Sequence, residues 1–111
     1  RSKGSWRGVS CNPTYNLIGL CMRAGKCVFG MEAVCEDIRR GRTQSVLISS
    51  SLAGNAREKL ERLCQPKRIP LHEIEDRDGA LGRCIGREGV KILSIQDRRL
   101  AYKIYESIET I

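Results

Sequence analysis

The chain has 111 residues, of which 41% are hydrophobic and 30% are charged, a balance typical of one compact domain and not of a disordered chain. No apolar run approaches the roughly 20 residues that cross a bilayer, and the N-terminal residues lack the apolar core of a signal peptide, so we expect a cytoplasmic protein without a membrane partner. The net charge of +7 favours a polyanionic partner such as RNA, with an ordinary solvated surface as the alternative.

Residues 1–12 carry glycines and serines with few apolar side chains, which predicts a flexible N-terminal tail. Residues 13–111 then form the single domain. An asparagine–proline pair is typical of a helix start, and apolar residues recur after it at spacings of three or four. We therefore expect a helix over 13–24, followed by a short strand over 26–29.

The next segment predicts a helix and a strand that are joined by a short connection. After Gly30, apolar residues recur at helical spacing, acids lie in the first turns and arginines in the last, and Gly41 can close the helix. The same pattern assigns Asp37 to the solvent-facing side. The run SVLIS over residues 45–49 is short, mostly apolar and β-branched, which is typical of a central strand.

A third helix is expected to end near Cys64. Asn55 with Glu58 three residues later has the spacing of a capping box at its start. An alternating apolar pattern then predicts a strand over 69–74, and His72 is interpreted as an ordinary residue of this strand.

The last third of the chain contains a polar loop, a short helix, a strand and a final helix. Asp78 is expected to cap the short fourth helix, and residues 90–95 are expected to form the last strand. Asp97 is expected to cap a C-terminal helix that buries Tyr105 together with aliphatic residues. Helices and strands thus alternate, which predicts an α/β fold, a three-layer α/β/α sandwich with a mixed sheet of about four strands.

The six cysteines, at positions 11, 21, 27, 35, 64 and 84, show no CxxC spacing, and four lie on predicted apolar helix faces. We interpret them as buried, reduced thiols. His72 is the only histidine, so no zinc site is expected. The glycines over 79–89 match no nucleotide-binding motif, and no nucleophile motif is present, so we expect neither a cofactor nor catalysis.

Several segments together resemble the ribosomal L-seven-Ae family of kink-turn RNA-binding proteins, and its small bacterial branch most closely. The segments are LIGLCMRAGKCVFGMEAVCEDIRRGRTQSVLIS, the third helix with its expected asparagine cap, RIPLHEI, LGRCIG and GVKILSI. The resemblance covers residues 17–108. It implies an α/β/α sandwich, the architecture that the alternating pattern predicts on its own, and binding of structured RNA without catalysis.

The resemblance implies that RNA meets the N-terminus of the second helix. The family motif there reads glycine, small residue, asparagine, glutamate and, after two further residues, lysine. The matching positions are Gly30, Met31, Glu32, Ala33 and Glu36. The glycine is kept, whereas two carboxylates now stand at asparagine and lysine positions, where they repel phosphate. Glu32 could instead accept from the N–H groups of an unpaired or sheared guanine, and the alternative is that both acids only stabilise the helix.

The resemblance implies a second contact at the loop before the fourth helix. Ile74, Glu75 and Asp76 replace the family's residues there, whereas Leu81 and Gly82 are retained. The candidate phosphate-binding cations are Lys26, Arg39, Arg40, Arg42 and Arg83, although each of them alone is more typical of a solvated charge. Their position in the family's binding region favours Lys26 and Arg83 over the others.

Two functions follow as hypotheses. The first is a non-catalytic, monomeric binder of kink-turn-like or ribosomal RNA, associated with ribosomal or other RNA-associated proteins. The second is a protein-interaction module on the same fold with an eroded RNA site, which the acidic residues Glu32 and Glu36 favour.

Overall fold

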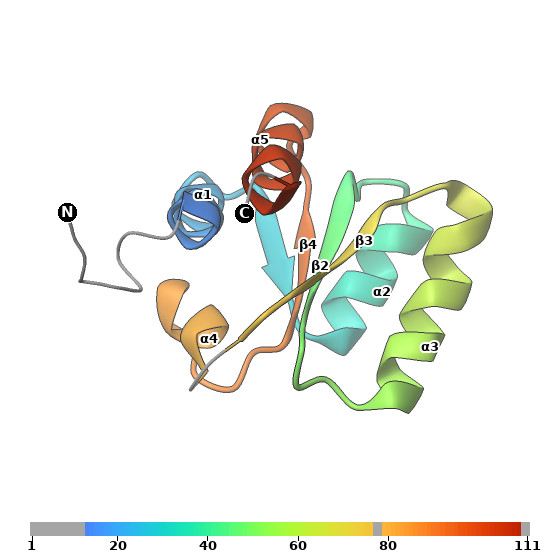
Figure 1. The fold of residues 1–111 in the computed structure, drawn as a ribbon. Coiled ribbons are helices and arrows are strands. Elements are labelled where there is room, and N and C mark those ends of the chain that lie inside the picture. Colours follow the sequence, from blue (N-terminus) through green and yellow to red (C-terminus); the bar gives the residue numbers. More distant parts are fainter. Residues whose placement is uncertain (1–12, 77–78, 110–111) are drawn as a thin grey trace, which may run out of the picture.

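A computed structural model of the chain describes residues 13–76 and 79–109 (Figure 1). Every expected helix and strand within these residues is present, and the strand bounds differ from the expected ones by at most two residues. The elements, in chain order, are α1 (Pro13–Arg23), β1 (Cys27–Phe29), α2 (Met31–Arg39), β2 (Ser45–Ser49), α3 (Gly54–Cys64), the 3-10 helix η2 (Gln65–Lys67), β3 (Leu71–Ile74), α4 (Ala80–Cys84), β4 (Ile92–Ile95) and α5 (Arg98–Glu109). The expected flexible tail lies outside the described residues.

The four strands form one mixed sheet in the order β1-β4-β2-β3. Strands β2 and β3 are parallel, and β4 runs antiparallel to both β1 and β2. Strands β1, β2 and β3 therefore end at the same edge of the sheet, lower in Figure 1, which we call the C-terminal edge. The opposite edge, where β2 and β3 begin and β4 ends, is called the N-terminal edge.

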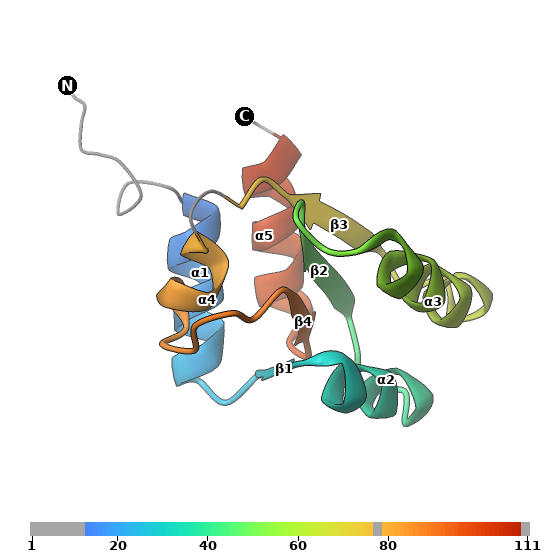
Figure 2. The ribbon, with the colours of Figure 1, turned by 90° about the horizontal axis from the view of Figure 1, so that it is seen from below.

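Helices cover both faces of the sheet, which confirms the predicted three-layer sandwich. Helices α1, α4 and α5 lie on one face, and α2 and α3 lie on the other (Figures 1 and 2). Strand β2 serves both cores because side chains alternate along a strand: Leu47 packs in the first core, whereas Val46 and Ile48 pack in the second. None of the helices over 13–76 and 79–109 is both long and apolar enough to span a membrane.

The helix ends confirm several predicted caps. Gly41 adopts φ 75° after α2, and its N–H donates to the Ile38 carbonyl at 3.1 Å, so it closes this helix as expected. The Asp97 carboxylate accepts from the Leu100 N–H at 3.0 Å and caps α5. Asp78, the expected cap of α4, lies outside the described residues, and Asp76 accepts from the Leu81 N–H there at 3.0 Å.

Two local predictions were wrong. The capping box of Asn55 and Glu58 does not form, because the helix cap is Ala53 and the Asn55 side chain accepts only from the neighbouring Ala56 N–H at 3.0 Å. Tyr105 is 42% exposed instead of buried. It lies on the side of α5 that faces the edge strand β3, where its ring contacts the His72 ring.

Asp37 also contradicts the prediction, since it is only 4% exposed. Its carboxylate accepts hydrogen bonds from Thr43 Oγ1 at 2.7 Å, Ser94 Oγ at 2.6 Å and Gln96 Nε2 at 2.7 Å. The residue lies three positions after Val34, so helical spacing puts it on the sheet side, where hydroxyl groups compensate its burial. This network fastens the end of α2 to β4.

The cysteines within the described residues form no disulfide. Burial raises the pKa of the Cys64 thiol, and likewise that of the Cys84 thiol, from the ordinary 9.0 to about 11. The unfolded chain therefore releases these protons at a lower pH than the folded protein does.

We expect the protein to lose stability as the pH rises from about 9 to about 11. The folded state holds more thiol protons than the unfolded state in this window, so its stabilisation is complete below pH 9 and is lost towards pH 11. Urea unfolding under reducing conditions at several pH values measures the loss. The double variant Cys64→Ala, Cys84→Ala should show a shallower pH dependence, and an unchanged dependence would contradict this origin.

Candidate functional site

The N-terminus of α2 is fixed to the sheet by Gly30. Gly30 has φ 92° and ψ 151°, a conformation that essentially only glycine adopts. Its N–H donates to the Ile92 carbonyl of β4 at 3.0 Å, and its carbonyl accepts from the Val34 N–H at 2.9 Å. The chain thus passes from β1 directly into α2 at the C-terminal edge.

This helix start is open to a ligand. No side chain caps it, because the cap residue is a glycine. The first amide groups of a helix have no partner within the helix, and together with the macrodipole they attract anions. Met31 is half-buried, whereas Glu32 and Ala33 are exposed beside these amides. The four positions from Gly30 to Ala33 therefore lie together, as the sequence predicts.

Glu36 lies about one turn farther along α2, and its carboxylate forms salt bridges with two arginines. Its carboxylate lies 2.5 Å from Arg40 Nε and 4.0 Å from Arg39 Nη1, and all three side chains are more than half exposed. The helix has nine residues and is therefore about 13 Å long, so these arginines lie at its far end. Arg39 and Arg40 are therefore not brought together with Gly30, and their phosphate-binding role stays a prediction.

Lys26 is likewise separated from Gly30. It precedes β1 at the N-terminal edge, where its carbonyl accepts from the Gln96 N–H at 2.8 Å. Four residues of extended chain span about 13 Å. Sequence proximity to the glycine is misleading here, because a strand runs between the two residues. Arg42 follows α2 at this same N-terminal edge, since it lies between Arg40 and β2.

The second predicted segment is built mainly from buried residues. Ile74, Leu81 and Gly82 are all buried, so they do not offer an exposed surface to a ligand. Glu75 and Arg83 are exposed. Glu75 directly follows β3, at the C-terminal edge and at the opposite side of the sheet from Gly30, whereas Arg83 lies on α4.

Asp76 holds this loop in place and is not an open carboxylate. It accepts from Ser49 Oγ at 2.9 Å and from the Leu81 N–H at 3.0 Å, and its own N–H donates to Ser50 Oγ at 3.0 Å. The Tyr15 hydroxyl donates to the Glu75 carbonyl at 2.8 Å. Burial, and then the nearby Asp76 charge, raise the pKa of the Tyr15 phenol, so this donor stays protonated.

Two cations at this edge are not among the residues that the sequence predicts for the site. The Arg87 guanidinium lies over the Phe29 ring, 5.5 Å from its centre, next to Gly30. Lys91 is exposed, and its carbonyl accepts from the Ser49 N–H at 2.8 Å. Phe29 pairs with Leu93, and continuing this register sets Met31 opposite Lys91. The sequence held one signal for this placement, the strand predicted over residues 90–95. If that strand pairs with β1, the residues just before it must lie near Gly30.

The C-terminal edge therefore combines an uncapped helix start, a cation stacked on an aromatic ring and a second exposed cation. Three strand spacings of about 4.8 Å separate the end of β1 from the end of β3, so Glu75 lies about 14 Å from Gly30 across the sheet. Charges of both signs are present, since Glu32, Glu75 and Glu88 are exposed as well. No cluster of three metal-ligating side chains occurs in the described part of the chain.

Comparisons with known proteins agree with this architecture. The family model for the ribosomal protein L7Ae/L30e/S12e/Gadd45 family matches residues 13–104. The RNA-binding protein YlxQ of Bacillus subtilis is 30% identical over 95 residues, covering 86% of this chain and 94% of YlxQ. The large ribosomal subunit protein eL30 of Trypanosoma brucei brucei is 31% identical over 81 residues, covering 72% of this chain and 77% of that protein.

A solved structure shares the fold. It is that of a Bacillus halodurans protein of unknown function, with a TM-score of 0.84 and 26% identity, covering 88% of this chain and 98% of that one.

Proposed function

The chain belongs to the ribosomal protein L7Ae/L30e/S12e/Gadd45 family, and we propose from this membership that it binds structured RNA without catalysing a reaction. The observation that carries the proposal is the uncapped start of α2 at Gly30, flanked by Arg87 and Lys91. The relatives support it, because the name of the Bacillus subtilis YlxQ protein describes RNA binding and eL30 is a ribosomal protein.

The geometry suits a bent or interrupted RNA helix. Free amides at the start of α2 and the Lys91 ammonium can each meet a phosphate of one strand. Arg87 on the Phe29 ring offers a flat surface on which an unpaired base can stack. RNA recognition targets such non-helical bases, so a kink-turn-like or ribosomal element is the proposed partner.

Glu32 has a defined role in this proposal. It is exposed one residue after the start of α2, where its carboxylate can accept from the adjacent N–H donors of an unpaired or sheared guanine. Contact with a guanine edge differs from contact with phosphate, which the carboxylate repels. As further parts of the proposal, the protein acts as a cytoplasmic monomer alongside ribosomal or other RNA-associated proteins.

The second candidate is a protein-interaction module. The pairing of Glu36 with Arg39 and Arg40 favours it, because those arginines are bound to a carboxylate instead of facing a phosphate path. A weak or absent preference for kink-turn RNA is the outcome that this candidate predicts.

We expect measurable RNA binding that weakens steeply with salt, since each neutralised phosphate releases counterions. Calorimetric titration against a standard kink-turn, a duplex of equal length and total cellular RNA separates specific recognition from charge attraction. Lys91→Gln should lower the affinity about tenfold and reduce the salt slope by about one. Lys67→Gln removes an exposed cation of η2 at the N-terminal edge and is the matched control.

Three results would contradict the proposal. The first is no binding at low salt. The second is equal affinity for the duplex and the kink-turn, which would reduce the interaction to charge attraction. The third is an equal effect of Lys91→Gln and Lys67→Gln, which would exclude the C-terminal edge as the site.

A further inference from the structure

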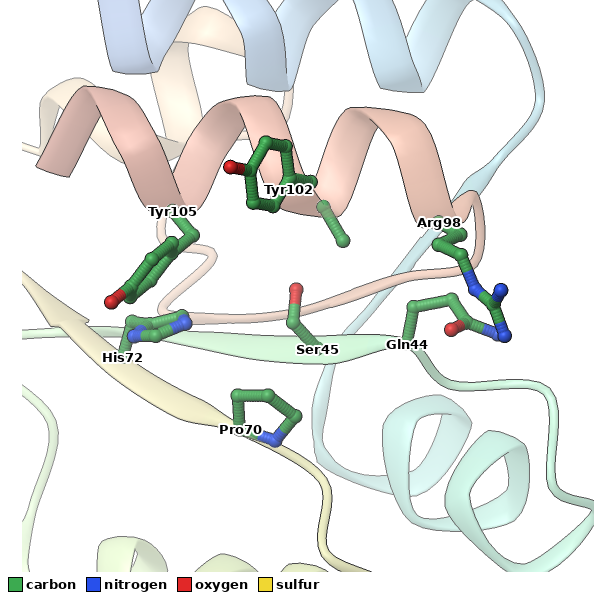
Figure 3. A pocket seen from close by; sticks show the side chains of 8 residues that line it. Gln44, Ser45, Pro70, His72, Arg98, Tyr102 and Tyr105 are labelled. Carbon is green, nitrogen blue, oxygen red and sulfur yellow. The ribbon is translucent and has the colours of Figure 1, made fainter.

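A pocket lies on the other side of the molecule, between α5 and the start of β2 and β3. Its volume is about 310 Å³, at the lower end of the roughly 300–1,000 Å³ typical of small-molecule sites. It exists because α5 leaves this end of the edge strand uncovered. The lining residues are Gln44, Ser45, Pro70, His72, Arg98, Ala101, Tyr102 and Tyr105 (Figure 3).

Ser45 is the polar group at the floor of this pocket. The residue is 2% exposed, and its hydroxyl has no hydrogen-bond partner within residues 13–76 and 79–109. Figure 3 shows the hydroxyl directed up from β2 towards α5, into the space below Tyr102. A buried hydroxyl without a partner costs free energy, and a ligand that offers a donor or an acceptor removes that cost.

Two tyrosines of α5 form the opposite wall. Tyr102 is 60% exposed, and its ring also lines a neighbouring hollow of about 450 Å³. Tyr105 is tilted by 39° against His72, with 5.6 Å between the ring centres. An exposed aromatic ring above a mainly apolar floor that holds the Ser45 hydroxyl suits a flat heterocycle.

One cation lines the pocket, and two more lie on the adjoining surface of α5. Arg98 lies at one end of it, beside Gln44 (Figure 3). Arg99 and Lys103 line the neighbouring hollow on the far side of Tyr102, where Glu106 is the one carboxylate among the lining residues. Three cations against one carboxylate favour an anionic ligand, and arginine binds phosphate in a fork geometry.

We propose that this pocket binds a single nucleotide. The base stacks on Tyr102 and Tyr105, the Ser45 hydroxyl pairs with its polar edge, and the phosphate meets Arg98. A free mononucleotide and an unpaired nucleotide of an RNA chain share this chemistry. The site does not depend on the proposed function, because it opens at the N-terminal edge and leaves Gly30 and Lys91 free to act at the opposite edge.

Amide chemical-shift mapping on the whole chain tests the proposal, with AMP, GMP, CMP and UMP as separate ligands. We expect shifts confined to residues around Ser45, His72 and Tyr102, and none with ribose 5-phosphate, which lacks a base. Tyr102→Ala should weaken binding about tenfold. Arg98→Gln should also weaken it about tenfold, and Ser45→Ala about threefold. Arg62→Gln, an exposed arginine of α3, is the matched control and should change nothing.

A short unstructured oligouridine distinguishes the two sources of the nucleotide. Much tighter binding than UMP, through the same residues, identifies an RNA chain, and similar binding identifies a free nucleotide. No binding of any nucleotide, shifts that map to the C-terminal edge, or equal binding of ribose 5-phosphate would overturn the site. Because Tyr102→Ala should leave kink-turn binding at the C-terminal edge unchanged, this inference and the proposed function fail independently.

Discussion

Gly82→Ala is expected to destabilise the protein by about 3 kcal/mol, because the added methyl group has no room. A Cβ at this position would lie 2.4 Å from the Arg87 carbonyl oxygen and 3.1 Å from the Gly89 nitrogen. Both are backbone atoms, so the turn between α4 and β4 must move as a whole. The same turn depends on the Arg87 N–H, which donates to the Gly82 carbonyl at 2.8 Å.

Thermal unfolding followed by circular dichroism measures this effect. A loss of about 3 kcal/mol in a domain of this size lowers the Tm by about 10 °C or more. Gly54→Ala is the matched control, since a Cβ there meets no atom within 4 Å apart from its chain neighbours and its own helix backbone, and the residue begins α3. Alanine should be neutral or stabilise that helix by about 0.5 kcal/mol. Equal Tm values for the two variants would contradict this expectation, because they would show that the turn between α4 and β4 accommodates the methyl group at little cost.

Gly82 also illustrates what a sequence resemblance can and cannot identify. The residue is retained at a position that the resemblance associates with RNA, and the structure places it against the backbone of the turn before Lys91. Its direct contact with RNA stays a prediction. Close packing is a sufficient physical reason for a glycine here, and no sequence pattern shows a distance between two backbones.

The layers and strands could be predicted because local rules agree with one another. The run over residues 45–49 has three consecutive apolar residues at its centre, and its strand is buried on both faces. Gly41 ends α2 because a left-handed residue is required after it. Such signals lie within a few residues of the feature that they determine.

The missed features depend on residues that are distant in sequence. Asp37 is buried because Thr43, Ser94 and Gln96 surround it, and two of these donors lie more than fifty residues away. The Arg87 side chain reaches the candidate site because β4 pairs with β1. Neither arrangement can be predicted from periodicity, which describes one element at a time.

The triple variant Glu32→Asn, Ala33→Glu, Glu36→Lys is expected to bind a standard kink-turn about tenfold to a hundredfold more tightly than the parent. These substitutions introduce the residues that the resembled family carries at the three positions. All three are exposed, so the buried stripe of Val34, Cys35 and Ile38 stays intact. One restored phosphate contact is worth about 1.5–3 kcal/mol, which corresponds to this range of affinity.

The triple variant is expected to lose some unfolding free energy, because it breaks two salt bridges. Glu36→Lys removes the pairs with Arg39 and Arg40 and places a third cation beside them. Exposed pairs of this kind contribute about 0.3–0.5 kcal/mol each, and the like-charge contacts that replace them cost a similar amount. We therefore expect a loss of about 1–2 kcal/mol in unfolding free energy, too little to unfold the domain.

Calorimetric titration with kink-turn RNA at several salt concentrations tests the expectation. The salt slope should steepen by about one, because one more phosphate is neutralised. Glu58→Lys, on the exposed side of α3, changes the net charge by the same two units away from the start of α2 and controls for charge alone. A folded triple variant that binds no better than Glu58→Lys would place the RNA site elsewhere. That result would favour the protein-interaction module, because the open start of α2 would then lack its proposed ligand.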